Sequence, residues 1–482
     1  MERSKKENLI ALLLVAAGAA VYISLIFNDN VWLDEAFTGS LIRTDMAGVL
    51  ERSMNDTLPP LYNIILKVMT DVFGYRVPVM KLTSVIPMIL SMLLSATVFR
   101  KRHGFMASCI LTTALFTMPN LLFFGVEIRM YSLGFFFAFA SAVYAYECIA
   151  GQGRISWVLF TLFSVLSGYS HHFAFVTVGF VYLFLLLYFI FFDRKNIKRW
   201  FLSLMACFIL YLPCLMITLE QLKRVSGYFS MPEITLAVFI KYIRYPYTVG
   251  FTPASILLLA SVAALFIFKL SELIRVDKGG NVRTLYAISC ILSYYGVLVF
   301  GTVISRIMTA NILVDRYLFF AEGLIWIFFA IGVSDLFLRA GDRGRYVVLS
   351  VSALMALCGI AGYIREYRIE YIKGVDELTA FMEENIEDGD VLIPIEDNEE
   401  MEYCLPFYDE GLIPCGNIEG TVSEYIKENP DASVWCSVID GKQIDDKELE
   451  EILGTDEISL RDEGSFSFDR YSLRLYELEP VY

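Results

Sequence analysis

Long apolar runs alternate with short polar segments along the first three quarters of the chain, and the pattern stops near residue 364. A helix that crosses a bilayer needs about 20 mostly apolar residues. Runs of that order predict helices at 9–28, 79–99, 104–124, 131–150, 156–170, 173–192, 200–218, 250–268, 285–304, 317–337 and 346–363. The first run is longer than the apolar core of a signal peptide and no small-residue cleavage site follows it, so we expect it to remain as an anchor. The pattern therefore predicts a polytopic α-helical membrane protein with about eleven transmembrane helices.

Composition and charge support this class and suggest an orientation. The chain is 56% hydrophobic and 15% aromatic, whereas soluble domains contain roughly 45–50% apolar residues. If the N-terminus is cytoplasmic, 18 of the 30 basic residues before position 364 fall in short inner loops, as the positive-inside rule requires. We therefore expect a multi-pass protein of the plasma membrane with a cytoplasmic N-terminus. An odd number of spans then places the C-terminal part outside the cytoplasm.

The part after residue 363 has a different character. It carries 9 basic and 33 acidic residues, so its net charge of −24 leaves +10 for the rest of the chain. So acidic a segment is unsuited to nucleic acid and favours solubility beside the membrane. Helix and strand patterns alternate, with a helix expected to start near Asp376 and Glu377 and a turn at Asp388-Gly389. We predict a membrane domain at 1–363, with long outer segments at 29–78 and 219–249, and a small extracytoplasmic α/β domain at 364–482.

The nine cysteines carry little functional information. Six lie in apolar runs, where cysteine packs as a small hydrophobic residue. Cys404, Cys415 and Cys436 lie in the acidic part, so at most one internal disulfide can form there. There is no CxxC pair and no zinc-finger spacing.

Ionisable residues gather at the predicted outer ends of the spans. Groups of this kind at membrane depth are costly and are by default functional candidates. Arginine holds phosphate through two parallel hydrogen bonds, and a carboxylate can take the proton of an attacking hydroxyl. Together they suit a site for a phosphate-bearing substrate and a proton transfer. The candidates are Asp34 and Glu35 in "VWLDEAFT", Asp56 in "NDTLPPLYN", Glu127, Arg129 and Tyr131 in "FGVEIRMYSL", His171 and His172 in "GYSHHFAF", and Arg306, Asp315 and Arg316 in "SRIMTANILVDRYLFF".

Each candidate also has an ordinary structural alternative. Asp34 could cap a helix over 35–43, and Asp56 could be a turn residue before the two prolines. The two arginines at 129 and 316 could extend to lipid headgroups. The histidine pair could bond neighbouring carbonyl groups, and Glu127 could neutralise its neighbouring arginine.

Five of these fragments, in order, resemble the motifs of the GT-C class of polytopic glycosyltransferases. They are "VWLDEAFT", "DTLPPLYN", "VEIRMYSL", "YSHHFAF" and "DRYLFF". The branch is that of the dolichyl-phosphate-mannose–protein mannosyltransferases and the bacterial lipid A aminoarabinose transferases. The resemblance spans about residues 1–340. It implies transfer of a sugar, with inversion, from a polyprenyl-phosphate donor to an acceptor outside the cytoplasm.

The resemblance also assigns roles to residues. Asp34 matches the family's catalytic base and Glu35 its partner, while Arg129 and Arg316 match groups for the donor phosphate. Asp56 matches the carboxylate of the "D-x-H-P-P" element, and His171 a position in a Thr-His-Tyr-like motif. Two positions differ from the pattern: Leu58 stands where the family has histidine, and His172 where it has tyrosine. Some relatives bind a divalent metal, for which the candidates here are Asp34, Glu127 and His171.

The sequence therefore predicts an inverting, polyprenyl-phosphate-sugar-dependent glycosyltransferase. Asp34 and Glu35 are the expected catalytic pair. The expected partners are the lipid-linked donor, membrane lipids, and an extracytoplasmic acceptor that is a protein, a lipid or a cell-wall glycan. Two other classes are possible. A polymerase or ligase of lipid-linked polysaccharide does not need an Asp-Glu pair after the first span. A transporter or flippase would have polar residues throughout the membrane depth, whereas here they lie at one edge. A membrane scaffold would tolerate Asp34→Asn without loss of function.

Overall fold

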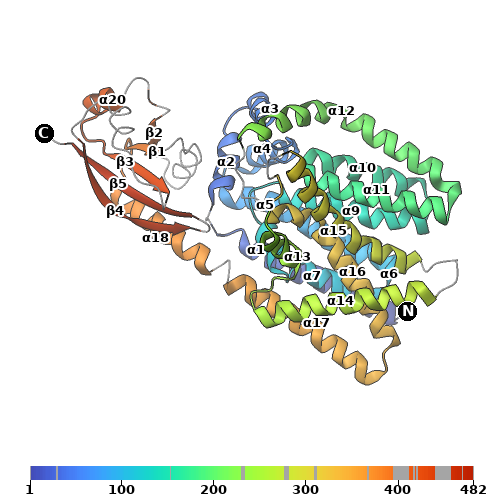
Figure 1. Ribbon diagram of the computed structural model, residues 1–482. Coiled ribbons are helices and arrows are strands. Elements are labelled where there is room, and N and C mark those ends of the chain that lie inside the picture. The colour runs from blue at the N-terminus through green and yellow to red at the C-terminus, as the bar shows by residue number, and fades with distance from the viewer. Residues whose placement is uncertain are drawn as a thin grey trace. The chain divides into compact units, whose positions relative to one another are not determined.

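The computed structural model describes most of the chain, and it divides into two compact units (Figure 1). The described residues are 2–28, 31–151, 153–228, 234–275, 282–308, 312–365, 369–394, 412–415, 418, 422–439, 458–468 and 471–480. The membrane unit comprises 1–27 and 44–363, and the second unit comprises 28–43 and 364–482. Each unit is described on its own.

The membrane unit is built of helices, and those that cover the predicted apolar runs follow in the predicted order. They are α1 (Glu2–Leu25), α3 (Met46–Asn55), α4 (Leu61–Phe73), α5 (Val77–Leu94), α6 (Arg100–His103), α7 (Phe105–Leu115), α8 (Pro119–Phe124), α9 (Tyr131–Ala150), α10 (Arg154–Ser170), α11 (His172–Phe191), α12 (Ile197–Tyr228), α13 (Leu236–Arg244), α14 (Thr252–Arg275), α15 (Val282–Ile307), α16 (Phe319–Arg339) and α17 (Asp342–Tyr363), with short η segments between some of them.

Eight of the described helical segments are long and apolar enough to cross a membrane. The other three predicted spans are also helical but shorter, namely α7, the 17-residue α10, and the apolar part of α17 at Leu349–Tyr363. The predicted span at 104–124 is not one helix. It breaks at 116–118 between α7 and α8, because Pro119 starts a new helix and disfavours helical backbone in the residue before it.

Helices α9 and α16 form the centre of the membrane unit. The span that contains α16 is 94% buried and α9 is 78% buried, whereas the spans of α1, α12 and α14 are less than a third buried. Helix α16 packs against α7, α9 and α15, and α9 packs against α5, α10 and α11. Segments that adjoin the ends of α9 and α16 are therefore held by the best-packed part of the protein.

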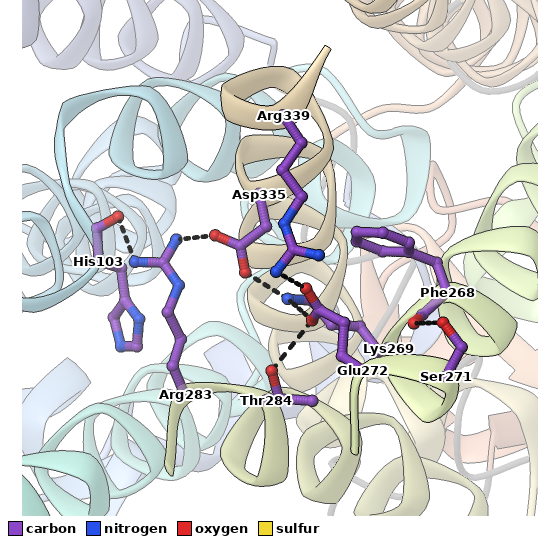
Figure 2. A network of polar contacts seen from close by, with 9 residues as sticks. All are labelled: His103, Phe268, Lys269, Ser271, Glu272, Arg283, Thr284, Asp335 and Arg339. Atoms are coloured by element: carbon purple, nitrogen blue, oxygen red, sulfur yellow. Dashed lines mark hydrogen bonds and ion pairs between the residues drawn. The ribbon is translucent and has the colours of Figure 1, made fainter. Parts of the chain in front are cut away.

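Five charged side chains form a network at the end of α16 that lies away from Arg316 (Figure 2). Lys269 of α14 is fully buried and pairs with Asp335 and, at 2.8 Å, with Glu272. Arg283 of α15 binds Asp335 at 2.9 Å, and Arg339 binds Glu272. The network ties together the ends of α14, α15 and α16. Lysine and arginine residues that the sequence analysis assigns to inner loops are thus partly neutralised by acids within the fold.

The second unit contains a five-stranded mixed sheet with the order β2-β1-β3-β5-β4. Strands β1 (Val391–Pro394), β2 (Ile413–Pro414) and β3 (Val434–Ile439) are parallel, and β5 (Tyr471–Pro480) is antiparallel to β3 and β4 (Ile458–Phe468). Helices α18 (Ile369–Asn385) and α20 (Val422–Glu428) precede β1 and β3. This confirms the α/β pattern, and the turn at Asp388-Gly389 has Gly389 at φ +99°.

One detail of this unit differs from the prediction made from the sequence. Helix α18 begins at Ile369, so the prediction of a helix start near Asp376 and Glu377 is wrong. The helical pattern of "DDKELEEILG" predicts a further helix, which lies outside the described residues. The unit also contains α2 (Leu33–Leu41), one of the helices expected in the first outer segment.

Candidate functional site

Glu127 and Arg129 lie in the tight turn between α8 and α9. The Arg129 N–H donates to the Glu127 carbonyl at 2.7 Å. Ser84 of α5 donates from its hydroxyl to the same carbonyl at 2.5 Å, and the Tyr62 hydroxyl of α4 lies 2.7 Å from Ser84. Glu127 is 5% exposed. Hydrogen bonds from α5, which α4 supports, thus fix the backbone that carries this carboxylate and guanidinium.

His171 lies between α10 and α11, where its imidazole caps α11. Its Nδ1 accepts a hydrogen bond from the Phe173 N–H at 3.0 Å, so the neutral ring carries its proton on Nε2. The ring stacks on Phe320 of α16 with centroids 4.2 Å apart, and it lies 4.7 Å from the ring of Tyr317. Gly134 of α9 allows this packing, because a Cβ there would come within 2.6 Å of the Phe320 ring.

The electrostatic surroundings of His171 link it to the predicted arginines. Burial lowers its pKa well below the ordinary value, and the positive charges of His172, Arg129 and Arg316 lower it further. The charges with the largest effect on this imidazole are therefore positive and come from three separate segments. The structure therefore places His172, Arg129 and Arg316 close enough to His171 for their charges to affect its ionisation.

Arg316 lies in the η4 turn (Asp315–Leu318) that leads into α16. Its backbone N–H donates to the Asp315 carboxylate at 2.9 Å, and Lys241 of α13 binds the same carboxylate at 2.9 Å. The Tyr242 hydroxyl donates to the Leu313 carbonyl at 3.2 Å. Burial and the nearby Asp315 carboxylate raise the pKa of Tyr242 to about 12, so it stays a hydrogen-bond donor. Helix α13 thus holds the arginine turn in place.

Asp56 ends α3, and the loop that follows it packs against α11 and α12. The Asp56 carboxylate accepts the Thr57 N–H at 2.6 Å, the turn role that the sequence allowed. Gln221 of α12 donates from its amide to the Leu58 carbonyl at 2.9 Å. His172 interacts with the Thr57 backbone and the Gln221 side chain. His172 therefore lies near Leu58, and these are the two positions at which the sequence differs from the GT-C motifs that it resembles.

Asp34 and Glu35 lie in the first turn of α2, in the second unit. The helix begins at Leu33 after Trp32 as its N-cap, so the alternative that Asp34 is the N-cap is wrong. Glu35 is 2% exposed and accepts the Trp32 N–H at 3.1 Å, so it supplies the capping contact. The catalytic roles of this pair stay predictions.

Two further candidates also stay predictions. Arg306 is exposed in the last turn of α15. Tyr131 is buried among aromatic rings, with its ring centroid 5.2 Å from Phe124 and 6.0 Å from Phe320. Within the described ranges, no group of three or more His, Cys, Asp or Glu side chains is arranged to hold a metal ion. The described residues therefore do not fit a complete metal site.

The structure adds residues that the sequence did not single out. Ser84, Gln221 and Phe320 each contact a predicted site residue or its loop. Ser84 and Phe320 lie in apolar runs, where nothing marks them. Gln221 stands at the polar end of an apolar helix, a place where an amide is unremarkable.

Comparisons with known proteins place this geometry in a known fold. No protein-family model and no curated protein sequence matches the chain. Among solved structures, it is similar to ArnT from Cupriavidus metallidurans in the apo state, with a TM-score of 0.61 and 12% identity over 96% of this chain and 97% of that one. The same protein bound to undecaprenyl phosphate matches with a TM-score of 0.58 and 13% identity over the same shares. The Archaeoglobus fulgidus oligosaccharyltransferase matches with a TM-score of 0.51 and 11% identity over 89% of this chain and 69% of that one. The predicted fold is confirmed: the chain is a polytopic helical membrane protein with a GT-C-like glycosyltransferase fold.

Proposed function

We propose that this protein is an inverting glycosyltransferase that moves a sugar from a polyprenyl-phosphate donor to an acceptor on the outer face of the plasma membrane. The observation that carries the proposal is the positive environment around buried His171, to which Arg129 and Arg316 both contribute. A guanidinium pair suits a phosphate. A similar structure is that of ArnT bound to undecaprenyl phosphate, which supports a lipid phosphate as the ligand. The N-terminus is proposed to be cytoplasmic and the α/β domain extracytoplasmic.

The proposed reaction is a single displacement at the anomeric carbon. Asp34 accepts the proton of the acceptor hydroxyl as the new bond from that oxygen to the anomeric carbon forms. The bond between the anomeric carbon and the phosphate oxygen breaks, and the lipid phosphate leaves with both electrons. Arg129 and Arg316 stabilise the charge that collects on the leaving phosphate. His171, a neutral donor through Nε2, is proposed to bond the same group, with Asp56 and Glu127 in supporting positions.

Purified protein in nanodiscs, supplied with a panel of undecaprenyl-phosphate-linked hexoses and pentoses, tests the proposal. Wild type is expected to release undecaprenyl phosphate and to label an acceptor with at least one sugar. Asp34→Asn is expected to lower kcat by about 10²–10⁴-fold, and Arg316→Ala to weaken donor binding. Asp45→Asn and Arg244→Ala are matched controls, because Asp45 only caps α3 and Arg244 is exposed at the end of α13.

Full turnover in Asp34→Asn would refute its role as the base. Equal effects of Arg316→Ala and Arg244→Ala would refute the phosphate site. Failure of wild type to bind or use any polyprenyl-phosphate sugar would refute the proposed function itself.

A further inference from the structure

Asn120 of α8 has a buried amide on which three segments of the membrane unit converge. The residue is 3% exposed. Its amide nitrogen donates to the Tyr245 carbonyl of η3 (Tyr245–Tyr247) at 3.0 Å and to the Glu322 carboxyl group of α16 at 3.4 Å. The two bonds span 125 and 202 positions of the chain. One side chain therefore links α8, η3 and α16.

The chemistry of the two partners fixes the orientation of this amide. A backbone carbonyl accepts hydrogen bonds and donates none, so the amide nitrogen and not the amide oxygen must face Tyr245. Glu322 is fully buried, and its other carboxyl oxygen accepts the indole N–H of Trp326 at 3.1 Å. The carboxyl group is thus held by its own helix and offers its second oxygen to the amide. Breaking this junction is costly, because buried acceptors would lose their donor.

Each of the linked segments leads to a part of the proposed phosphate site. Helix α8 is followed by the turn that carries Arg129. The η4 turn that carries Arg316 directly precedes α16. Segment η3 follows α13, the helix that holds the Arg316 turn. The ring centroids of Phe124 in α8 and Phe319 in α16 also lie 5.4 Å apart. The packing of α8 on α16 therefore bears directly on the spacing of the two arginines.

Resting on the proposed function, we propose that Asn120 is a positioning residue that sets the spacing of Arg129 and Arg316 for the phosphate of the donor lipid. It does not touch the phosphate and acts through the backbone segments that carry the two guanidiniums. Groups that are held in place before a ligand arrives bind it more tightly, because less freedom is lost on binding. A displacement of about 1 Å at such groups can cost roughly 100-fold in rate.

A double-mutant cycle on the binding of undecaprenyl phosphate tests the proposal. The Kd of this lipid is measured in nanodiscs for wild type, Asn120→Leu, Arg316→Ala and the double variant. Asn120→Leu is expected to raise the Kd by about 10-fold. In the Arg316→Ala background its effect should be less than about threefold, because one of the two positioned guanidiniums is already missing. Asn120→Asp has the same size but can donate at most one hydrogen, so it provides the same comparison if Asn120→Leu does not fold. Arg316→Lys supplies the background if binding by Arg316→Ala is too weak to measure.

Asn196→Leu is the control for the loss of a buried amide elsewhere. Asn196 is 6% exposed in η2 (Arg194–Asn196) and donates to the Asp193 carboxylate at 2.7 Å. Its removal should lower the melting temperature without changing the Kd of undecaprenyl phosphate. An unchanged Kd in Asn120→Leu, or an equal factor in the wild-type and Arg316→Ala backgrounds, would overturn the positioning role and leave the proposed function standing. If wild type does not bind undecaprenyl phosphate, both proposals fall.

Discussion

Replacing Lys269 with methionine should destabilise the membrane unit far more than the same change at an ion pair whose carboxylate is exposed. Lys269 is fully buried and contacts the carboxylates of Glu272 and Asp335 (Figure 2). Methionine keeps most of the side-chain volume but removes the ammonium group. Two acids, 5% and 15% exposed, then remain, and among the described residues Arg283 and Arg339 still pair with them.

The magnitude follows from burial. Removal of one partner of a buried ion pair costs about 3–5 kcal/mol, because the remaining charge stays desolvated. The two arginines compensate part of this, so we expect the low end, about 3 kcal/mol. Lys67→Met is the matched control, since Lys67 is 15% exposed and pairs at 2.6 Å with Asp71, which is 52% exposed and lies one turn along α4. Exposed pairs of this spacing contribute about 0.3–0.5 kcal/mol.

Unfolding of the purified protein by SDS in mixed micelles measures both variants. Lys269→Met should shift the folded-to-unfolded ratio by more than 100-fold at a fixed SDS fraction, and Lys67→Met by less than threefold. If the two variants lie within about 1 kcal/mol of each other, the network does not hold the helix ends, and the interpretation of Figure 2 is wrong.

Three further predictions concern packing, hydrogen bonding and thiol chemistry. Gly134→Ala should cost about 1–3 kcal/mol and lower transfer, because its Cβ would strike the Phe320 ring that supports the imidazole; unchanged melting and turnover would contradict this. Ser84→Ala should cost about 1–3 kcal/mol in the same SDS titration, because it removes the buried hydroxyl that bonds both the Tyr62 hydroxyl and the Glu127 carbonyl, whereas a neutral result would show that the turn is held by other contacts. Burial raises the pKa of Cys436 to about 12. At pH 8 the fraction of this thiol that is ionised is therefore roughly a thousand times smaller than for an ordinary cysteine. Alkylation of Cys436 by iodoacetamide, measured by peptide mass spectrometry, should be slower by a similar factor until the domain unfolds.

The sequence was sufficient for the order of the helices because each apolar run needs a bilayer-length helix. It was weaker at their ends. The break before Pro119 was signalled by the proline itself, yet the unbroken hydropathy of 104–124 outweighed it. Likewise α2 begins at Leu33, so Glu35 and not Asp34 makes the capping contact. Helix ends assigned by different criteria commonly differ by one or two residues.

The supporting residues could not be predicted because their contacts are long-range. Gln221 meets Leu58 across 163 positions, and Ser84 meets Glu127 across 43. Nothing local distinguishes such residues from ordinary polar residues in or at the end of an apolar helix. The candidates themselves were recognisable because a charge at the end of an apolar run is costly wherever the run packs.

The charged groups near the two ends of the central helix α16 have different surroundings. At the end near Arg339, each of the three cations of the network contacts one of two carboxylates, so the charges partly neutralise one another. At the end near Arg316, the charges that act most on His171 are all positive. Under the proposed function these two arginines hold the lipid phosphate. Neutralising Arg129 or Arg316 should therefore raise the pKa of His171, because a positive charge that disfavours its protonated form is removed, and should weaken the binding of undecaprenyl phosphate.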